Sequence, residues 1–213
     1  MKSKGIKFPE IYGLDKKCGL IAQKAVKKVE RFVTEKRLFI YVFPQINEWV
    51  IRNMNGLGGR TVWKNTIYLE VFPKKGWERE FAKTMIHELT HVATRYYFGG
   101  KYSFGECFVH EGLAENFREF ILGGKESWTK AISKPEAMRI LSKLKPEINK
   151  EPSMKRYSEI FFGTGKYPNW AGYTIGYYLV KEYLKKRYTD KGKKIDWKEV
   201  FETNPKEILK VWG

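Results

Sequence analysis

The segment His87-Glu88-Leu89-Thr90-His91 constrains this chain more than any other part of its sequence. It lies in an apolar stretch, Met85 to Ala93, that is typical of a buried helix. Residues four apart share a helix face, so both imidazoles can bind one zinc ion at about 2.0–2.1 Å. Glu88 follows about 100° further round the helix, where its carboxylate can take a proton from metal-bound water. The segment predicts one zinc ion per chain.

The same spacing could arise by accident on a solvated helix face. The neighbouring side chains would then be polar, whereas the residues around the histidines are Met85, Ile86, Leu89, Val92 and Ala93. Burying two histidines and a glutamate costs free energy unless a partner satisfies them. A metal ion is the simplest partner, so we favour the zinc interpretation.

A catalytic zinc site has three protein ligands and one water, so a third ligand is expected downstream. Glu111 is the best candidate, separated from His91 by the 19 residues 92–110. That length allows the first helix to end at Gly99-Gly100 and a second helix to return beside it. The second helix is expected from about Ser103 to Leu122, before Gly123-Gly124.

Three further residues near Glu111 could take part in the site. Glu115, one turn later, is expected to accept a hydrogen bond from the other nitrogen of a ligand histidine. His110 cannot point the same way as Glu111 on a helix, so we expect it to lie behind the ligands or to contact substrate. Cys107 could reach the metal as a thiolate, but we interpret it as a small buried hydrophobe.

The H-E-x-x-H segment followed by Glu111-Gly112-Leu113-Ala114-Glu115 resembles the gluzincin metallopeptidases, the group that includes thermolysin. With the later segment Ala171-Gly172-Tyr173-Thr174-Ile175-Gly176-Tyr177-Tyr178, the chain is still more similar to a predicted Zn-dependent protease family, first catalogued as a domain of unknown function. The resemblance covers roughly residues 60 to 185. It implies a zincin-like fold, a zinc cofactor and a strand that binds extended substrate by edge pairing. We assign that strand role to Ile67, Tyr68 and Leu69.

The hydrophobic patterns predict an α+β fold: a small twisted sheet on the zinc helix and a mainly helical C-terminal half. A helix is expected over 14–36, strands over 38–43 and 66–72, and the zinc helix from about Trp77. The glycine-rich segment 53–59 is assigned to a hairpin or loop. The later helices are expected over 135–145, 154–162 and 170–186, with one or two short ones within 196–211. We treat 1–213 as one domain with an N-terminal helix and sheet part (1–76), a zinc-binding helix pair (77–124) and a helical part (125–213).

The composition of the chain indicates which cellular compartment and which partners to expect. It has 213 residues, 42% of them hydrophobic, with no apolar run long enough for a membrane span. The basic start lacks the apolar core of a secretory signal, and two distant cysteines form no motif, so a cytoplasmic protein without a membrane partner is expected. The net charge of +17 comes from lysines spread along the chain, which favours a solvated surface over nucleic-acid binding.

These features predict a zinc metallopeptidase that acts on peptides or unfolded protein. Glu88 would serve as general base, and Tyr173 would donate a hydrogen bond to the developing oxyanion. Tyr177 or His110 could be that donor instead, and both tyrosines could simply pack in the core. A nucleic-acid-associated protein with a regulatory or structural zinc domain is the alternative function. An inactive fold held together by metal is a third, against which the presence of Glu88 argues.

Overall fold

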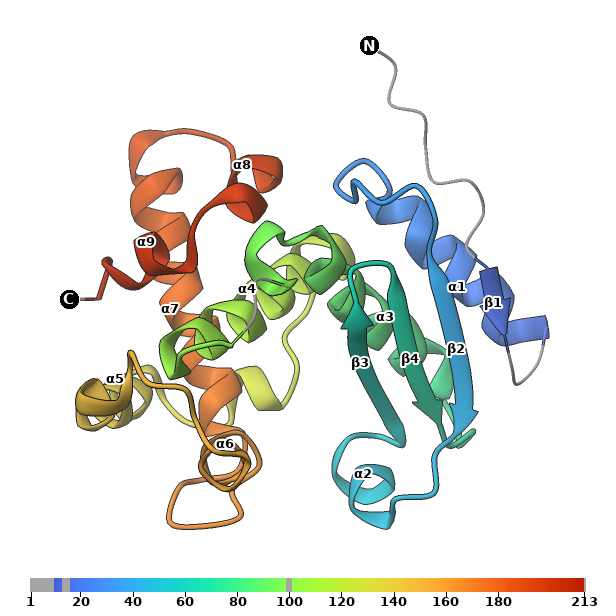
Figure 1. The fold of residues 1–213 in the computed structure, drawn as a ribbon, viewed down its shortest axis with the longest axis horizontal. Helices are drawn as coiled ribbons and strands as arrows, with labels where there is room; N and C mark the ends of the chain where they lie inside the picture. Colours follow the sequence, from blue (N-terminus) through green and yellow to red (C-terminus); the bar gives the residue numbers. More distant parts are fainter. Residues whose placement is uncertain (1–9, 13–15, 99–100, 213) are drawn as a thin grey trace. The chain divides into compact units, whose positions relative to one another are not determined.

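The computed structural model describes residues 10–12, 16–98 and 101–212 of the chain. It divides into two compact units, residues 1–94 and 95–213 (Figure 1). The first unit contains a small mixed sheet and helices, and the described part of the second is helical. The predicted α+β class with a mainly helical C-terminal half is therefore confirmed. The boundary after Thr94 falls inside the segment 77–124 that the sequence analysis treats as one helix pair. A single domain stays a prediction.

The sheet of the first unit has four strands in the order β1-β2-β4-β3. The strands are β1 (Glu10–Tyr12), β2 (Phe39–Pro44), β3 (Leu57–Trp63) and β4 (Thr66–Val71). β2 runs parallel to both β1 and β4, whereas β3 is antiparallel to β4. The two predicted strands are confirmed as β2 and β4. Their order places β4 in the interior and β3 at the edge (Figure 1).

β3 corrects the sequence analysis, which expected hairpin or loop chemistry over 53–59 and no strand after it. The turn is confined to Asn55 and Gly56, both with positive φ (55° and 76°). Gly58 and Gly59 already lie within the strand. Near its end the pairing with β4 shifts between Thr61 and Trp63, a bulge of the kind that bends a strand and redirects its side chains.

One face of the sheet forms the core of the first unit. Alternate residues point inward and are at most 3% exposed; they are Ile40, Val42, Ile67, Leu69 and Val71. Helix α3 (Trp77–Ala93) packs against β3, β4 and α1 (Lys16–Val29). α1 is shorter than the expected 14–36, since it ends at Val29. α2 (Glu48–Asn53) is a short helix capped by the Asn47 side chain.

The second unit is built around a pair of long helices, α4 (Phe104–Leu122) and α7 (Ala171–Arg187). The shorter helices are α5 (Lys134–Lys143), α6 (Met154–Phe161), α8 (Trp197–Glu202) and α9 (Pro205–Leu209), with 3-10 turns at Arg95–Phe98, Trp128–Lys130, Lys145–Glu147 and Thr189–Lys191. Both predicted ends of α4 are confirmed. Ser103 and Glu106 form a reciprocal capping box, and Gly123 ends the helix with φ 71°.

Candidate metal centre

Helix α3 carries His87, Glu88 and His91 in the first unit. It begins at Trp77, as predicted, directly after Gly76, whose φ is 84°. Phe81, Met85 and Leu89 are completely buried and fix the rotation of the helix about its axis. The same packing buries Glu88 and His91, which are 4% and 2% exposed, and leaves His87 half-buried.

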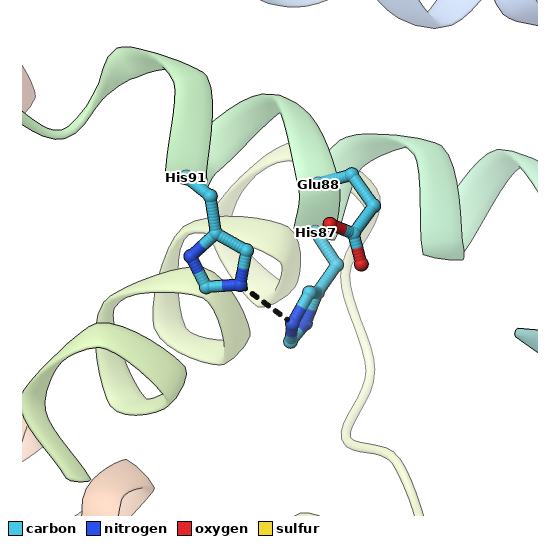
Figure 2. Close-up of side chains that lie close together, drawn as sticks. All are labelled: His87, Glu88 and His91. Carbon is cyan, nitrogen blue, oxygen red and sulfur yellow. Dashed lines mark hydrogen bonds between the residues drawn. The ribbon is translucent and has the colours of Figure 1, made fainter. Parts of the chain in front are cut away.

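The ligand atoms of these three side chains converge. One ligand atom from each of His87, Glu88 and His91 lies within 4.8 Å of the others. The two Nε2 atoms of the histidines are 3.2 Å apart (Figure 2). Two nitrogens bound to one tetrahedral zinc ion would be about 3.3–3.4 Å apart, given a bond length of about 2.0–2.1 Å. The separation also permits a hydrogen bond between the rings, but two paired histidines beside a carboxylate fit the donor set of a zinc site.

Glu88 is held from the edge strand of the sheet. The Thr61 hydroxyl donates to the Glu88 carboxylate at Oε2, 2.7 Å away, and lies 3.0 Å from the Glu88 carbonyl oxygen. Sequence reasoning missed Thr61 because no local pattern predicts β3 or its alignment with the helix.

The residues predicted around Glu111, together with Tyr173, lie in the second unit. Glu111 is half-buried in the middle of α4. Its carboxylate interacts electrostatically with the phenol of Tyr157 in α6. Burial raises the pKa of Tyr157 well above its usual range, and the charges of Glu111 and then Tyr173 raise it further. Tyr173 also packs against Phe161, with ring centroids 5.3 Å apart. The structure thus gathers Glu111, Tyr157 and Tyr173, and sequence reasoning missed Tyr157, since nothing local marks it.

Cys107 also lies near Glu111. Burial raises the pKa of the Cys107 thiol to about 12, and the charge of Glu111 contributes to the shift. The protonated thiol is a poor metal ligand, because the thiolate is the form that binds zinc. Cys107 is half-buried, so its interpretation as a small buried hydrophobe stays a prediction.

His110 faces an aromatic cluster instead of the carboxylate beside it. Its ring contacts Tyr97 and Tyr102 edge-on, at centroid distances of 5.2 and 5.0 Å. It is 3% exposed, and neither ring nitrogen has a hydrogen-bond partner among the residues the structure describes. Burial lowers the pKa of His110 to about 4, so the ring is neutral at physiological pH. Its expected role, to support the metal ligands or to contact the substrate, stays a prediction.

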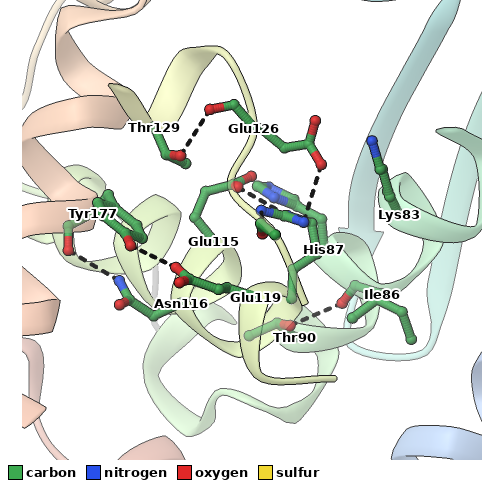
Figure 3. Close-up of polar contacts among 12 residues, drawn as sticks. Lys83, Ile86, His87, Thr90, Glu115, Asn116, Glu119, Glu126, Thr129 and Tyr177 are labelled. Carbon is green, nitrogen blue, oxygen red and sulfur yellow. Dashed lines mark hydrogen bonds and ion pairs between the residues drawn. The ribbon is translucent and has the colours of Figure 1, made fainter. Parts of the chain in front are cut away.

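Glu115 belongs to a buried ion cluster in the second unit (Figure 3). Arg118 Nε lies 3.1 Å from Glu115 Oε2, and its Nη1 lies 3.0 Å from Glu126 Oε1. The Arg118 and Glu115 side chains are each 1% exposed and that of Glu126 is 8% exposed. This cluster holds Glu115 in one position, which a carboxylate that orients a ligand histidine requires. That role of Glu115 stays a prediction.

Of the two tyrosines considered for the oxyanion, Tyr177 has its hydroxyl occupied. It donates to Glu119 at 2.5 Å (Figure 3). It also accepts a hydrogen bond from Lys181 at 2.6 Å. Burial and the bond to Glu119 raise its pKa. These contacts argue against Tyr177 as a donor to substrate.

The substrate-binding role expected for Ile67, Tyr68 and Leu69 conflicts with the sheet topology. These residues lie in β4, which pairs with β2 on one side and with β3 on the other. A strand with both edges occupied cannot add an extended peptide by edge pairing. The error arose because the sequence analysis lacked β3, the strand that occupies the outer edge.

A small mixed sheet packed on a helix that presents two histidines and a glutamate is typical of zinc-binding H-E-x-x-H proteins. The family described as "Predicted Zn-dependent protease (DUF2268)" matches residues 18–210, and the chain belongs to this family. No curated protein and no solved structure matches the chain. None of the described helices is long and apolar enough to cross a membrane.

Proposed function

We propose that this protein is a zinc metallopeptidase of the gluzincin type that hydrolyses peptide bonds in peptides or unfolded protein. The observation that carries the proposal is the convergence of the His87 and His91 Nε2 atoms, 3.2 Å apart, with the Glu88 carboxylate beside them. A structural zinc site would normally be closed by four protein ligands and needs no adjacent base. The family assignment supports the same chemistry.

In this proposal His87, His91 and Glu111 hold the zinc ion, which would act as a Lewis acid and lower the pKa of water at the site. Glu88 takes the proton from that water as general base and returns it to the leaving amine. A buried carboxylate suits this role, because a fixed base in a dry site needs little reorganisation. Tyr173 donates a hydrogen bond to the developing oxyanion, and Tyr157, close to both Glu111 and Tyr173, is the second candidate.

We further propose β3, in place of β4, as the strand that binds substrate. It is the edge strand of the described sheet and pairs only with β4. An extended peptide could pair with its outer backbone groups, a mode that gives affinity with little side-chain preference. Thr61 and Gly59 lie on this strand in contact distance of Glu88, so a paired peptide would run close to the base.

The test is Glu88→Gln, which removes the base but preserves the shape of the side chain. We expect one zinc ion per chain by elemental analysis and loss of casein hydrolysis by at least about a hundredfold. Glu78→Gln on the same helix is the control, because Glu78 is paired with Lys17 at the surface and should leave hydrolysis unchanged. A Glu88→Gln protein that cleaves as fast as the parent would show that the assignment is wrong. Chelation should abolish hydrolysis, and added zinc should restore it.

A further inference from the structure

The Glu88 carboxylate is anchored to β3 by the buried hydroxyl of Thr61. Thr61 Oγ1 donates to Glu88 Oε2 at 2.7 Å, and Thr61 is only 8% exposed. The hydroxyl also lies 3.0 Å from the Glu88 carbonyl oxygen, so it contacts both the backbone and the side chain of the same residue. A hydrogen bond to a charged group is stronger than one between neutral groups, so the contact to Oε2 dominates.

Gly59 brings the other carboxylate oxygen against the same strand. It lies two residues before Thr61, and therefore on the same strand face. A Cβ at Gly59 would lie 2.7 Å from Glu88 Oε1, 2.7 Å from Thr84 Cγ2 and 2.9 Å from Glu88 Cγ. Only glycine leaves room for the carboxylate here. Oε2 is thus held by Thr61, and Oε1 lies beside the backbone at Gly59.

We propose that Thr61 is a positioning residue for the general base, with Gly59 providing the space that its carboxylate occupies. The inference rests on the proposed function. A glutamate side chain has several rotatable bonds, and a base must be fixed within hydrogen-bond reach of the proton it accepts. Anchoring Oε2 restricts that freedom and holds the carboxylate in one place. Because β3 is also the proposed substrate strand, the same contacts set the register between a bound peptide and the base.

The test compares two substitutions of one side chain. Thr61→Val has nearly the same shape but cannot donate, whereas Thr61→Ser retains the hydroxyl. For Thr61→Val we expect kcat to fall about ten- to hundredfold, with KM changed less than about threefold, because the base is misplaced and substrate binding is not. Thr61→Ser should recover kcat to within a few-fold of the parent. Zinc content should equal that of the parent in both, because Thr61 is not a ligand.

Thr66→Val is the matched control. Thr66 is another buried threonine of the same sheet, 6% exposed, and its hydroxyl donates to Asn65 instead of Glu88. The Thr66→Val substitution should leave kcat unchanged. If Thr61→Val and Thr66→Val behave alike, or if Thr61→Val loses zinc in proportion to activity, Thr61 has only a structural role and the inference is overturned.

Gly59→Ala tests the other half of the arrangement. A methyl group there must displace the carboxylate, so kcat should fall at least about tenfold with zinc retained. Unchanged kcat in Gly59→Ala would contradict the proposed fit. Failure of the peptidase function itself gives a different result: the parent would not hydrolyse casein, or Glu88→Gln would be as active as the parent, and this inference would fall with it.

Discussion

Gly112 on α4 and Gly176 on α7 bring the backbones of these two helices into direct contact. A Cβ at Gly112 would lie 2.1 Å from the Gly176 carbonyl oxygen, and a Cβ at Gly176 would lie 2.2 Å from the carbonyl oxygen of Phe108. Gly112 belongs to the Glu-Gly-Leu-Ala-Glu segment and Gly176 to the Gly-Tyr segment, the two motifs that carry the family resemblance beyond the histidines. The two glycines therefore have a packing reason to be there.

Gly176→Ala is expected to destabilise the protein by about 3 kcal/mol or more, because the methyl group meets backbone that cannot move aside. Gly19→Ala is the matched control, since a Cβ at this position in α1 would meet nothing within 4 Å. There the better helix propensity of alanine should stabilise by about 0.5–1 kcal/mol. Urea unfolding followed by tryptophan fluorescence measures both. Equal effects in the two variants would contradict the close contact of α4 and α7.

Arg118→Met should cost about 3–5 kcal/mol of stability, because it leaves the Glu115 and Glu126 carboxylates buried without their cation. Arg139→Met is the control: Arg139 is paired with Glu136 at the surface, 59% exposed, and its loss should cost less than about 1 kcal/mol. The measurement is the free energy of unfolding at pH 7. If Arg118→Met lowers the free energy of unfolding no more than Arg139→Met does, the cluster does not stabilise this unit.

His110 should make the protein sensitive to acid. Its pKa is lowered from 6.5 to about 4 by burial, so between these values the unfolded chain binds a proton that the folded chain does not. Stability contributed by the neutral ring is therefore present above pH 6.5 and lost as the pH falls toward 4, by about 3 kcal/mol at most. His110→Phe keeps an aromatic ring among Tyr97 and Tyr102 without a titrating group. Unfolding of the chelated protein at pH 7 and 4.5 should show a smaller difference in the variant; the same difference as in the parent would refute the buried neutral state.

The zinc ligands can be ranked by affinity. Glu111→Ala should weaken zinc binding far more than His110→Ala, because the first removes a proposed ligand and the second a residue turned toward Tyr97 and Tyr102. For His110→Ala, which replaces a residue that does not itself bind the metal, zinc affinity should fall by at most about 10–100-fold. Competition with a chelating dye measures both affinities. The reverse order would overturn the assignment of Glu111.

Local signals were sufficient for the elements that carry most of the candidate site. The apolar stretch around His87 and His91 predicted α3 together with its start at Trp77. A serine cap and paired glycines predicted both ends of α4. The β-rich runs before Pro44 and Pro73 predicted β2 and β4.

The pairing of strands and side chains that lie far apart in the sequence could not be predicted from local signals. β3 has Gly58 and Gly59 near its start, residues that are disfavoured in strands, and its pairing with β4 outweighs that preference. Strand order is set by tertiary packing, so the interior position of β4 could not be read from its own residues. The contact of Thr61 with Glu88 spans 27 positions along the chain and depends on the alignment of β3 with α3. Tyr157 likewise approaches Glu111 only through the fold.

The two variable positions of the H-E-x-x-H segment are constrained as tightly as its histidines and glutamate. Leu89 and Thr90 are both 0% exposed, and the Thr90 hydroxyl donates to the carbonyl oxygen of Ile86 in its own helix. A polar residue longer than threonine would bring a group into this interior that its own helical turn could not satisfy. Transplanting the five-residue metal-binding segment into another scaffold would therefore require a recipient helix whose surroundings accept a buried leucine and a buried threonine that is satisfied within its own helix.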